Sequence, residues 1–319
     1  MRKIVVNCLK KDTKISKYIL MMFPCLHMSS LYKALRQKDI KVNNTRISKD
    51  INVKNNDTIE LYISDDILFS IQKHINYIYE DTNILVAYKD QGILSNNEDA
   101  KASLNELTFE EMVKKDKNDI NNSIHICHRL DRNTAGLIVF SKNDNAYEQL
   151  LKAFKLGYIK KEYIAFVANA NFKKDNGCIT SYIVKDLKTN YSKVYEEPIK
   201  NSKKIVTSYT VLEKNKILDY AKLNIQIHTG KTHQIRSQFA HISHPVIGDS
   251  KYGKNVVNRK FGIYKQLLFA YKYTFKFPED YTLNYLNNIT IQKDIRNYLE
   301  EKSEKSIKKQ NDKNSQKKN

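Results

Sequence analysis

Hydrophobic positions in the first 65 residues predict a small module of helices and strands. Residues 15–22 and 30–38 carry apolar side chains about one helical turn apart, which is typical of helices that bury one face. Ser29 or Ser30 is the expected N-cap of the second helix, because a hydroxyl can accept a hydrogen bond from an amide of the first turn. Short apolar or alternating runs predict strands at residues 3–7, 40–42 and 58–63.

The remainder of the chain alternates between helix and strand patterns. Apolar residues recur at helical spacing over residues 146–154, with Asn143 or Asn145 as the expected cap and Gly157 in the position that often follows a helix. Further helices are expected at residues 104–114 and from Thr232 onward. Strands are expected at residues 84–87, 124–126, 137–140, 158–167 and 223–227.

A chain of 319 residues is too long for one small core and suits two domains. We expect an N-terminal domain at residues 1–65, a linker at residues 66–75 and a larger domain at residues 76–299. Residues 300–319 contain seven lysines and four acidic residues with almost no apolar side chains, so we expect a disordered basic tail.

The chain carries a formal net charge of +20, most of it outside the tail. Neutralising phosphates releases counterions, so a strongly basic protein is typical of one that binds a nucleic acid. A chain so rich in Lys, Asn and Ile also fits biased nucleotide usage, which raises the lysine content without any such partner. Charge alone therefore favours nucleic-acid binding without requiring it.

Cysteine usage and hydropathy bear on the compartment. The four cysteines show no C-x-x-C spacing, so neither a disulfide framework nor a zinc site is indicated. The N-terminus has only a short apolar run before further lysines, and no segment approaches the roughly 18 apolar residues that a membrane span needs. We therefore expect an unprocessed, soluble protein of the reducing cytoplasm that does not bind a membrane.

Residues 124–141 place a charged segment between two short apolar runs, so a sheet is expected to hold this segment as a loop. Within the loop, Asp131 lies between Arg129 and Arg132. Nearby positive charge favours the ionised carboxylate, which suits Asp131 to act as a nucleophile or as an electrostatic stabiliser. The alternative is an ordinary surface ion pair in a turn.

The segment HRLDRNTAGLIVFSK at residues 128–142 closely resembles the catalytic-aspartate motif of the RluA-type pseudouridine synthases. In that family HRLD is followed by Arg, any residue, Thr, a small residue that is usually Ser, and Gly; here the small residue is Ala135. The resemblance implies that Asp131 is the catalytic carboxylate and that Arg132 enters the gap left by a flipped base. It also implies that neighbouring side chains bind the substrate or shape its loop, namely Arg129, Arg132 and Thr134.

A second block, TGKTHQIRSQFAHISHPVIGDSKYG at residues 229–253, resembles the T-G-R-T-H-Q-I-R and H-P-x-x-G-D-x-x-Y-G motifs of the same family, with Lys231 where Arg is commoner. By this resemblance, Arg236 pairs with Asp131 and positions it. His233 lies one helical turn from Arg236 on the same face, where we expect it to contribute to substrate binding.

Two shorter matches complete the expected base pocket. Lys161-x-Tyr163 matches the K-x-Y motif of the family, which implies that Tyr163 stacks on the target base. Residues 266–271, QLLFAY, resemble its L-L-H-A segment, with Phe269 in place of His, which implies that Leu268 lines the pocket.

The N-terminal module, with LYKALRQKDIKVNNTRI and later NNDTIELYI, resembles the RNA-binding domain named after small-subunit ribosomal protein four. Its expected RNA-binding residues are basic side chains of the second helix and the turn after it: Lys33, Arg36, Lys38, Lys41 and Arg46. A solvated face of a helical hairpin is the alternative. Together the resemblances imply an α+β fold, in which a small helical-hairpin RNA-binding domain precedes a catalytic domain with a mixed, largely antiparallel β-sheet flanked by helices.

The predicted reaction needs no cofactor. The motifs supply an Asp, an Arg and a Tyr but neither a phosphate-cradling Gly loop nor a Ser-His pair, and the chain has only 8 glycines. The resemblance implies an enzyme that isomerises uridine to pseudouridine in RNA, and we expect it to be monomeric and metal-free. By family analogy, the N-terminal domain favours large-subunit ribosomal RNA over transfer RNA as the substrate.

Three alternatives remain open on the sequence. A metal site would use four histidines, although Pro245 interrupts their helix and no H-E-x-x-H pattern accompanies them: His228, His233, His241 and His244. A catalytically idle RNA-binding or ribosome-assembly factor would keep the fold, but intact Asp131, Tyr163 and Arg236 count against it. A metal-dependent nuclease would need a cluster of paired carboxylates, which the sequence does not show.

Overall fold

The computed structural model describes residues 2–7, 9, 12–23, 26, 28–68, 75–96, 107–186, 189, 191–253, 255–296 and 299. The expected tail at residues 300–319 and most of the expected linker lie outside the described residues. The chain divides into two compact units, one made of Met1–Ile75 with Asn97–Leu107 and the other of Asn76–Asn96 with Thr108–Asn319.

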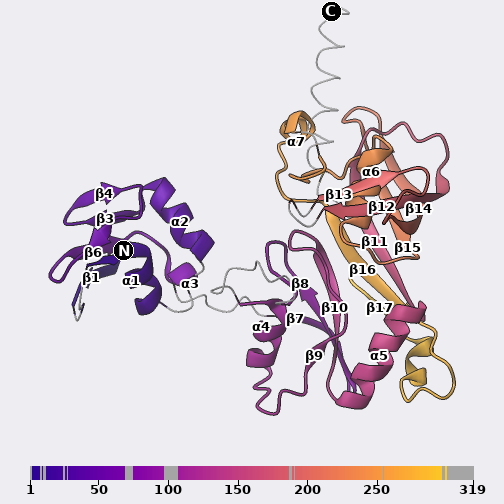
Figure 1. Cartoon of the computed structure of the whole chain (residues 1–319), viewed down its shortest axis with the longest axis horizontal. Coiled ribbons are helices and arrows are strands. Elements are labelled where there is room, and N and C mark those ends of the chain that lie inside the picture. The colour runs from indigo at the N-terminus through magenta and orange to yellow at the C-terminus, as the bar shows by residue number, and fades with distance from the viewer. Residues whose placement is uncertain are drawn as a thin grey trace, which may run out of the picture. The chain divides into compact units, whose positions relative to one another are not determined.

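The first unit is built on an antiparallel four-stranded sheet with the strand order β1-β6-β3-β4 (Figure 1). Its strands are β1 (Arg2–Val5), β3 (Ile40–Val42), β4 (Thr45–Ile47) and β6 (Thr58–Leu61). The other described elements are α1 (Ile15–Met22), α2 (Met28–Gln37), α3 (Asp65–Leu68) and a separate strand pair, β2 (Thr13–Lys14) with β5 (Asn52–Val53).

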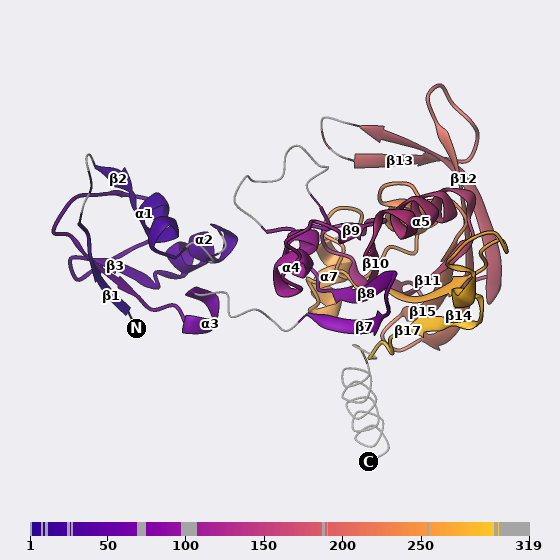
Figure 2. The ribbon, with the colours of Figure 1, turned by 90° about the horizontal axis from the view of Figure 1, so that it is seen from below.

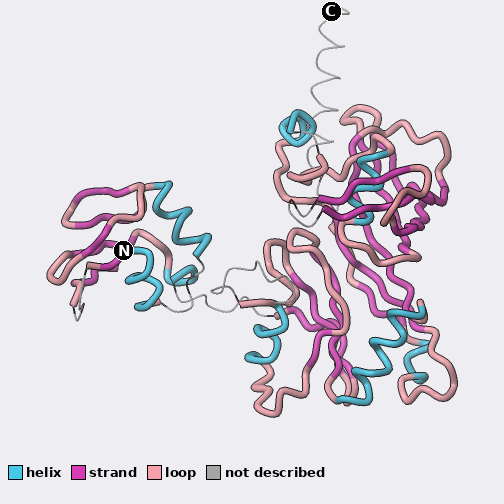
Figure 3. The backbone as a smooth tube through the Cα atoms, in the orientation of Figure 1, coloured by secondary structure: helices cyan, strands magenta, loops and turns pink. Residues whose placement is uncertain are grey.

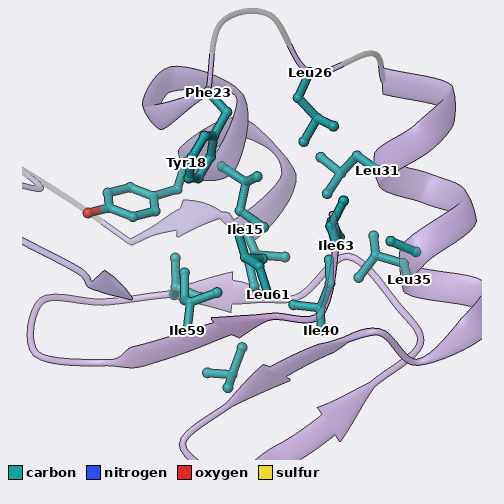
Figure 4. Close-up of a cluster of buried hydrophobic side chains, with 14 of the residues drawn as sticks. Ile15, Tyr18, Phe23, Leu26, Leu31, Leu35, Ile40, Ile59, Leu61 and Ile63 are labelled. Carbon is teal, nitrogen blue, oxygen red and sulfur yellow. The ribbon is translucent and has the colours of Figure 1, made fainter. Parts of the chain in front are cut away.

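One apolar cluster joins the helices of the first unit to its sheet (Figure 4). Ile15 and Tyr18 of α1 and Leu31 and Leu35 of α2 are buried in this cluster. They meet buried side chains of the sheet, namely Ile40, Ile59 and Leu61. The helical spacing that predicted both helices is therefore the spacing of their buried faces.

Two details of the first unit differ from the sequence-based expectation. α2 begins at Met28, so Ser29 and Ser30 lie within its first turn and neither is its N-cap. α3 begins at Asp65, and Leu68 is fully buried in the same apolar cluster. The first unit therefore continues beyond residue 65, because Leu68 packs into its core. Local sequence does not predict this contact.

The second unit is built on an 11-stranded sheet. Its main path has the order β13-β12-β14-β15-β11-β16-β10-β8-β7, while β17 pairs with β16 and β9 pairs with β10. Among the described strands, the pairings are antiparallel except for β10 with β16, which is parallel. The strands are β7 (Asn76–Glu80), β8 (Ile84–Lys89), β9 (His125–Ile126), β10 (Ala135–Ser141), β11 (Ile159–Ala168), β12 (Asn176–Asp186), β13 (Tyr191–Tyr195), β14 (Lys203–Asn215), β15 (Tyr220–Ile227), β16 (Leu268–Phe275) and β17 (Thr290–Gln292).

Strands and the loops between them make up most of the second unit, which has few helices among its described residues (Figure 3). The helices are α4 (Phe109–Asp116), α5 (Asp144–Leu156), α6 (Gln234–His241), α7 (Asn255–Phe261) and the 3-10 segment η1 (Asn284–Asn288). α5 packs beside β10 (Figure 2). The expected α+β catalytic domain with a mixed, largely antiparallel sheet is therefore confirmed.

Two helix ends in the second unit follow local sequence. The Asn143 side chain accepts a 2.9 Å hydrogen bond from the Ala146 amide at the start of α5, and Gly157 ends that helix with a φ of 81°. α4 begins later than expected, at Phe109, with Thr108 as its cap. The expected first residues of that helix, 104–106, lie outside the described residues.

Strand β10 carries the site loop and is buried at all seven positions, which explains its continuous apolar sequence. Gly136 has a φ of 137°, and a Cβ at this position would lie 2.3 Å from the carbonyl oxygen of Ala270 in β16. Only glycine allows the two backbones to approach this closely. No helix in the described part of the chain has the length and apolar character that crossing a membrane requires.

Candidate active site

Asp131 lies in the loop that connects β9 to β10, as its sequence context predicts. The Thr134 amide donates to the Asp131 carbonyl at 3.0 Å and closes the turn. The preceding residue, Leu130, is buried, and both of its backbone polar groups bond to the Ser95 hydroxyl, at 2.9 and 3.0 Å. The loop is therefore fixed on both sides of the carboxylate.

Lys89 fixes the same loop through hydrogen bonds to backbone carbonyls. Its fully buried ammonium donates to the carbonyls of Asp90, Ile93 and Arg132 at 3.2, 2.9 and 3.1 Å. Burial lowers the pKa of Lys89 to about 7, although the nearby Asp131 charge opposes that shift. One side chain thus ties the end of β8 to the Asp131 loop.

Asp131 and Arg236 form a close ion pair between segments 105 residues apart. Arg236 Nη1 donates to Asp131 Oδ2 at 2.9 Å. On its other side, the guanidinium donates through Nε and Nη2 to the two oxygens of Asp249, at 2.7 and 3.1 Å. This two-point pairing fixes the plane of the guanidinium, so Asp249 aims Arg236 at Asp131.

Burial makes the Arg236–Asp249 pair strong and costly to break. Asp249 is 1% exposed and also accepts hydrogen bonds from the amides of Lys251 and Tyr252. Burial opposes ionisation of Asp249, but the Arg236 guanidinium and these amides outweigh it and lower the pKa of Asp249. Burial also opposes the charge on Arg236, yet the bonds to Asp249 and the charge of Asp131 raise its pKa.

His233 approaches the same carboxylate from the start of α6. The residue has a left-handed φ of 58° at the N-cap position, so the expected cap Thr232 is wrong. The Tyr252 hydroxyl accepts from the Ser192 amide at 2.8 Å and lies 2.8 Å from His233 Nδ1. The other ring nitrogen, Nε2, lies 3.9 Å from Asp131 Oδ2. Burial lowers the pKa of His233 to about 4 and keeps the ring neutral near pH 7.

A cavity of about 480 Å³ opens beside Asp131. Tyr163 and Leu268 line it, and so do Arg129, Thr134 and Arg236. Tyr163 is only 6% exposed, and burial together with the Asp131 charge raises the pKa of its hydroxyl. The volume lies in the range of small-molecule sites, so a nucleoside fits.

Comparison with known proteins identifies the family. Residues 83–241 match the family model described as RNA pseudouridylate synthase. The chain is 32% identical to an uncharacterized RNA pseudouridine synthase of Mycoplasma capricolum over 314 residues, which cover 92% of this chain and 97% of the relative. This chain belongs to the RNA pseudouridine synthase family. Its activity is therefore the isomerisation of uridine in RNA.

Other relatives of the synthase agree with the RluA-type motifs. It is 28% identical to the ribosomal large subunit pseudouridine synthase C of Rickettsia typhi, over 76% of this chain and 83% of that protein. It is 33% identical to the ribosomal large subunit pseudouridine synthase D of Blochmanniella floridana, over 57% of this chain and 54% of that protein. The solved human RNA pseudouridylate synthase domain containing 4 shares the fold, with a TM-score of 0.55, 19% identity and coverage of 73% of this chain and 93% of that chain.

Arg132 and Thr134, two of the predicted substrate-binding residues, have their polar groups bonded within the protein, and of the two only Thr134 lines the cavity. Arg132 turns to the neighbouring loop, where its Nε donates to the Gly92 carbonyl at 3.0 Å. Thr134 is 3% exposed, and its hydroxyl accepts from the Gln266 side chain at 2.8 Å. Both side chains therefore help to fix the Asp131 loop.

The sequence interpretation gives no role to Asp249 or Lys89, although each has a clear place in the site. Asp249 stands in the G-D pair of the second motif, which is the signal that could have revealed it. Lys89 ends the buried strand β8, and a charged residue in that position is a local signal for it. Neither signal shows the partner, because the partners lie far away in the sequence.

In the first unit, basic residues gather around an exposed tyrosine. Lys41 and Arg46 pair across β3 and β4, and their charged groups lie 5.2 and 4.9 Å from the centre of the Tyr62 ring. Arg46 also donates to the carbonyl of Lys38. The remaining predicted residues of this group, Lys33 and Arg36, lie on the exposed face of α2.

The four histidines considered as metal ligands have separate neighbours. His228 bonds to the Ser208 hydroxyl at 2.8 Å, and His244 stacks on Phe172 with ring centres 3.9 Å apart. His233 bonds to Tyr252, and His241 is exposed. In the part of the chain that the structure describes, no three His, Cys, Asp or Glu side chains group as metal ligands.

Proposed function

We propose that Asp131 is the catalytic carboxylate of this synthase and that its substrate is large-subunit ribosomal RNA. The assignment of Asp131 rests on a difference in hydrogen bonding between its two carboxylate oxygens. Oδ2 accepts from Arg236, whereas no hydrogen-bond donor among the described residues reaches Oδ1. The side chain is 23% exposed and lines the cavity, so Oδ1 remains available to a substrate.

The reaction requires a carboxylate in this state. The N1–C1′ bond of the uridine breaks, the uracil turns in place, C5 bonds to C1′ and loses its proton, and N1 gains a proton, so the product is an isomer of uridine. Positive character develops on the sugar when the first bond breaks, and an ionised Asp131 stabilises it. Two routes are open to that carboxylate: attack on C1′, or removal of the C2′ proton. Arg236 acts as a positioning residue in both, because it aims the carboxylate and keeps it ionised.

The cavity supplies what the free uracil needs during the reaction. Tyr163 offers a buried aromatic ring for the base to contact, and Leu268 offers an apolar wall. A partly enclosed pocket keeps the detached uracil beside the sugar. Taking the uridine out of the RNA stack costs a few kcal/mol, which base contacts and basic surface offset.

We also propose that the first unit is an RNA-binding domain like that of small-subunit ribosomal protein four. Lys41 and Arg46 beside the exposed Tyr62 give a positive surface with an aromatic face, and both features favour RNA. Relatives named as ribosomal large subunit synthases support the substrate class.

Since Asp131, Tyr163 and Arg236 come from one chain, we expect a monomer, which light scattering tests.

The deciding experiment maps pseudouridines in ribosomal and transfer RNA from a strain that lacks the protein. The strain is complemented in parallel with wild type, with Asp131→Asn and with Asp280→Asn. Asp280 is an exposed aspartate of the turn before η1, so Asp280→Asn makes the same chemical change away from the cavity. We expect the lost sites to return with wild type and Asp280→Asn only, because Asp131→Asn should lower the rate roughly a thousandfold or more.

Each result has one meaning. Return of the sites with Asp131→Asn would show that another group performs the chemistry. Loss of sites in transfer RNA alone would leave Asp131 in place and overturn the ribosomal substrate. If deletion changes no site, purified protein on transcripts of both RNAs replaces the strain, with the same three variants.

A further inference from the structure

A second, larger cavity of about 990 Å³ adjoins the active-site cavity. Its lining residues come from the end of α5, the start of β11 and the ends of β15 and β16. The two cavities share six lining residues: Phe154, Lys155, Lys161, Ile227, Gly230 and Lys231. They are therefore one continuous depression with the carboxylate at one end.

The larger cavity is strongly positive. Its lining includes six lysines and a single acidic residue, Glu162. Glu162 is already paired with Lys160 at 3.0 Å and with Lys272 at 3.7 Å. The other four lysine side chains have no hydrogen bond or ion pair with any described residue: Lys155, Lys161, Lys231 and Lys276.

Lys161 stands where the two cavities meet and is the most constrained of these lysines. It lies two positions before Tyr163 on β11, and its ammonium is 5.3 Å from the centre of the Phe154 ring. Burial lowers the pKa of Lys161, and no carboxylate offsets that effect. A buried cation without a counterion lowers the stability of the free protein. Its presence therefore indicates that Lys161 has a function that offsets this cost.

We propose that Lys161 binds a backbone phosphate next to the flipped uridine and that the lysine cavity carries the RNA strand onward from that phosphate. The proposal rests on the proposed function, because a uridine beside Asp131 fixes where the strand enters. A phosphate is the anion that a single-stranded RNA presents at every step. It also supplies the negative charge that would neutralise these four lysines.

The first test measures affinity against salt for a short oligocytidylate with one central uridine, using the full chain. Lys161→Met should reduce the slope of log affinity against log salt by about 0.7, the value for one phosphate contact in a single strand. Lys216→Gln is the matched control, because Lys216 is exposed in the turn at the other end of β15. It should leave the slope unchanged. Lys161→Met should also raise the melting temperature, since it removes a buried unpaired charge.

The second test neutralises one phosphate at a time with a methylphosphonate linkage in the same RNA. One linkage beside the uridine should weaken binding to wild type about tenfold, as expected for a lost charged hydrogen bond. The same linkage should have no effect on Lys161→Met. Equal losses in both proteins, no sensitive linkage, or no salt-dependent binding by wild type would overturn the proposal.

Failure of this inference is separable from failure of the proposed function. Both tests measure binding, whereas the role of Asp131 is measured by conversion of the central uridine. Asp131→Asn should bind the RNA with the wild-type salt slope but leave the uridine unconverted. Conversion of the uridine by Asp131→Asn would overturn the catalytic assignment of Asp131. It would leave open what Lys161 binds.

Discussion

At the scale of single residues, Asp249 has the largest expected effect outside the reacting carboxylate. It supplies both hydrogen bonds that orient Arg236, from a position with 1% exposure. Asp249→Asn should lower the free energy of unfolding by about 3–5 kcal/mol, because a buried guanidinium loses its charged partner. It should also slow the reaction about tenfold to a hundredfold, because Asp131 is no longer aimed.

Urea unfolding and single-turnover assays check this prediction. The control is Asp175→Asn, whose carboxylate is 64% exposed and pairs with Lys214 on the surface. That variant should change the unfolding free energy by less than about 1 kcal/mol. Similar losses in the two variants would contradict the role of Asp249.

His233 makes stability depend on acid pH. Its pKa is about 4 in the folded protein, below the ordinary 6.5. Between these pH values the unfolded chain binds the proton and the folded chain does not, so folded stability falls as pH falls from about 6.5 to 4. His233→Gln removes this contribution, which amounts to at most about 3 kcal/mol. The unfolding free energy of wild type minus that of the variant should fall by up to about 3 kcal/mol as pH falls from 6.5 to 4; a constant difference would contradict the prediction.

At the scale of elements, the parallel contact between β10 and β16 depends on Gly136. A Cβ there would meet the Ala270 backbone at 2.3 Å, in a backbone conformation that glycine favours. Gly136→Ala should therefore lower the free energy of unfolding by more than about 3 kcal/mol. Gly157→Ala is the control, since its φ is 81° but no atom lies within 4 Å. It should cost only about 1 kcal/mol; equal costs would show that close approach is unimportant.

Elements with local signals could be predicted from the sequence, and elements positioned by distant partners could not. α5 was predictable because Asn143 and Gly157 mark its ends within the same segment. The start of α6 was not, since His233 takes a left-handed conformation at the N-cap and its side chain bonds to Tyr252, which lies beyond the helix. The position of β16 between β10 and β11 also escapes the sequence, because an apolar run does not name its neighbours.

The same distinction applies to the candidate site. Asp131, Tyr163 and Arg236 could be named because they stand in specific motifs, and the structure brings all three to one cavity. The turn of Arg132 toward Gly92 and the pairing of Asp249 with Arg236 could not be predicted. Each depends on a segment that only the fold brings near.

At the scale of the whole molecule, the net charge of +20 should make RNA binding strongly salt-dependent. Replacing Lys33, Arg36 and Arg46 with Gln should reduce the salt slope for ribosomal RNA by about 2, if each contacts a phosphate. The single-turnover rate at saturating RNA should not change, because these residues belong to the first unit.

A control with the same net charge keeps this test specific. Lys173, Lys200 and Lys216 are exposed in the second unit and can be replaced with Gln together. We expect a smaller change in slope from this variant. If the two variants weaken binding equally, the first unit has no special part in holding RNA.

The sheet order also determines when during synthesis the enzyme can become active. β16 is among the last strands to be made, yet it lies between β10, which follows the Asp131 loop, and β11, which leads through β15 toward Arg236. Until residues 268–275 leave the ribosome, the two halves of the sheet have no strand to join them, and each exposes an unpaired edge. A nascent chain that already contains Asp131 and Arg236 still lacks the strand that joins the two halves of the sheet. We therefore expect no activity from a nascent chain until residues 268–275 have been made.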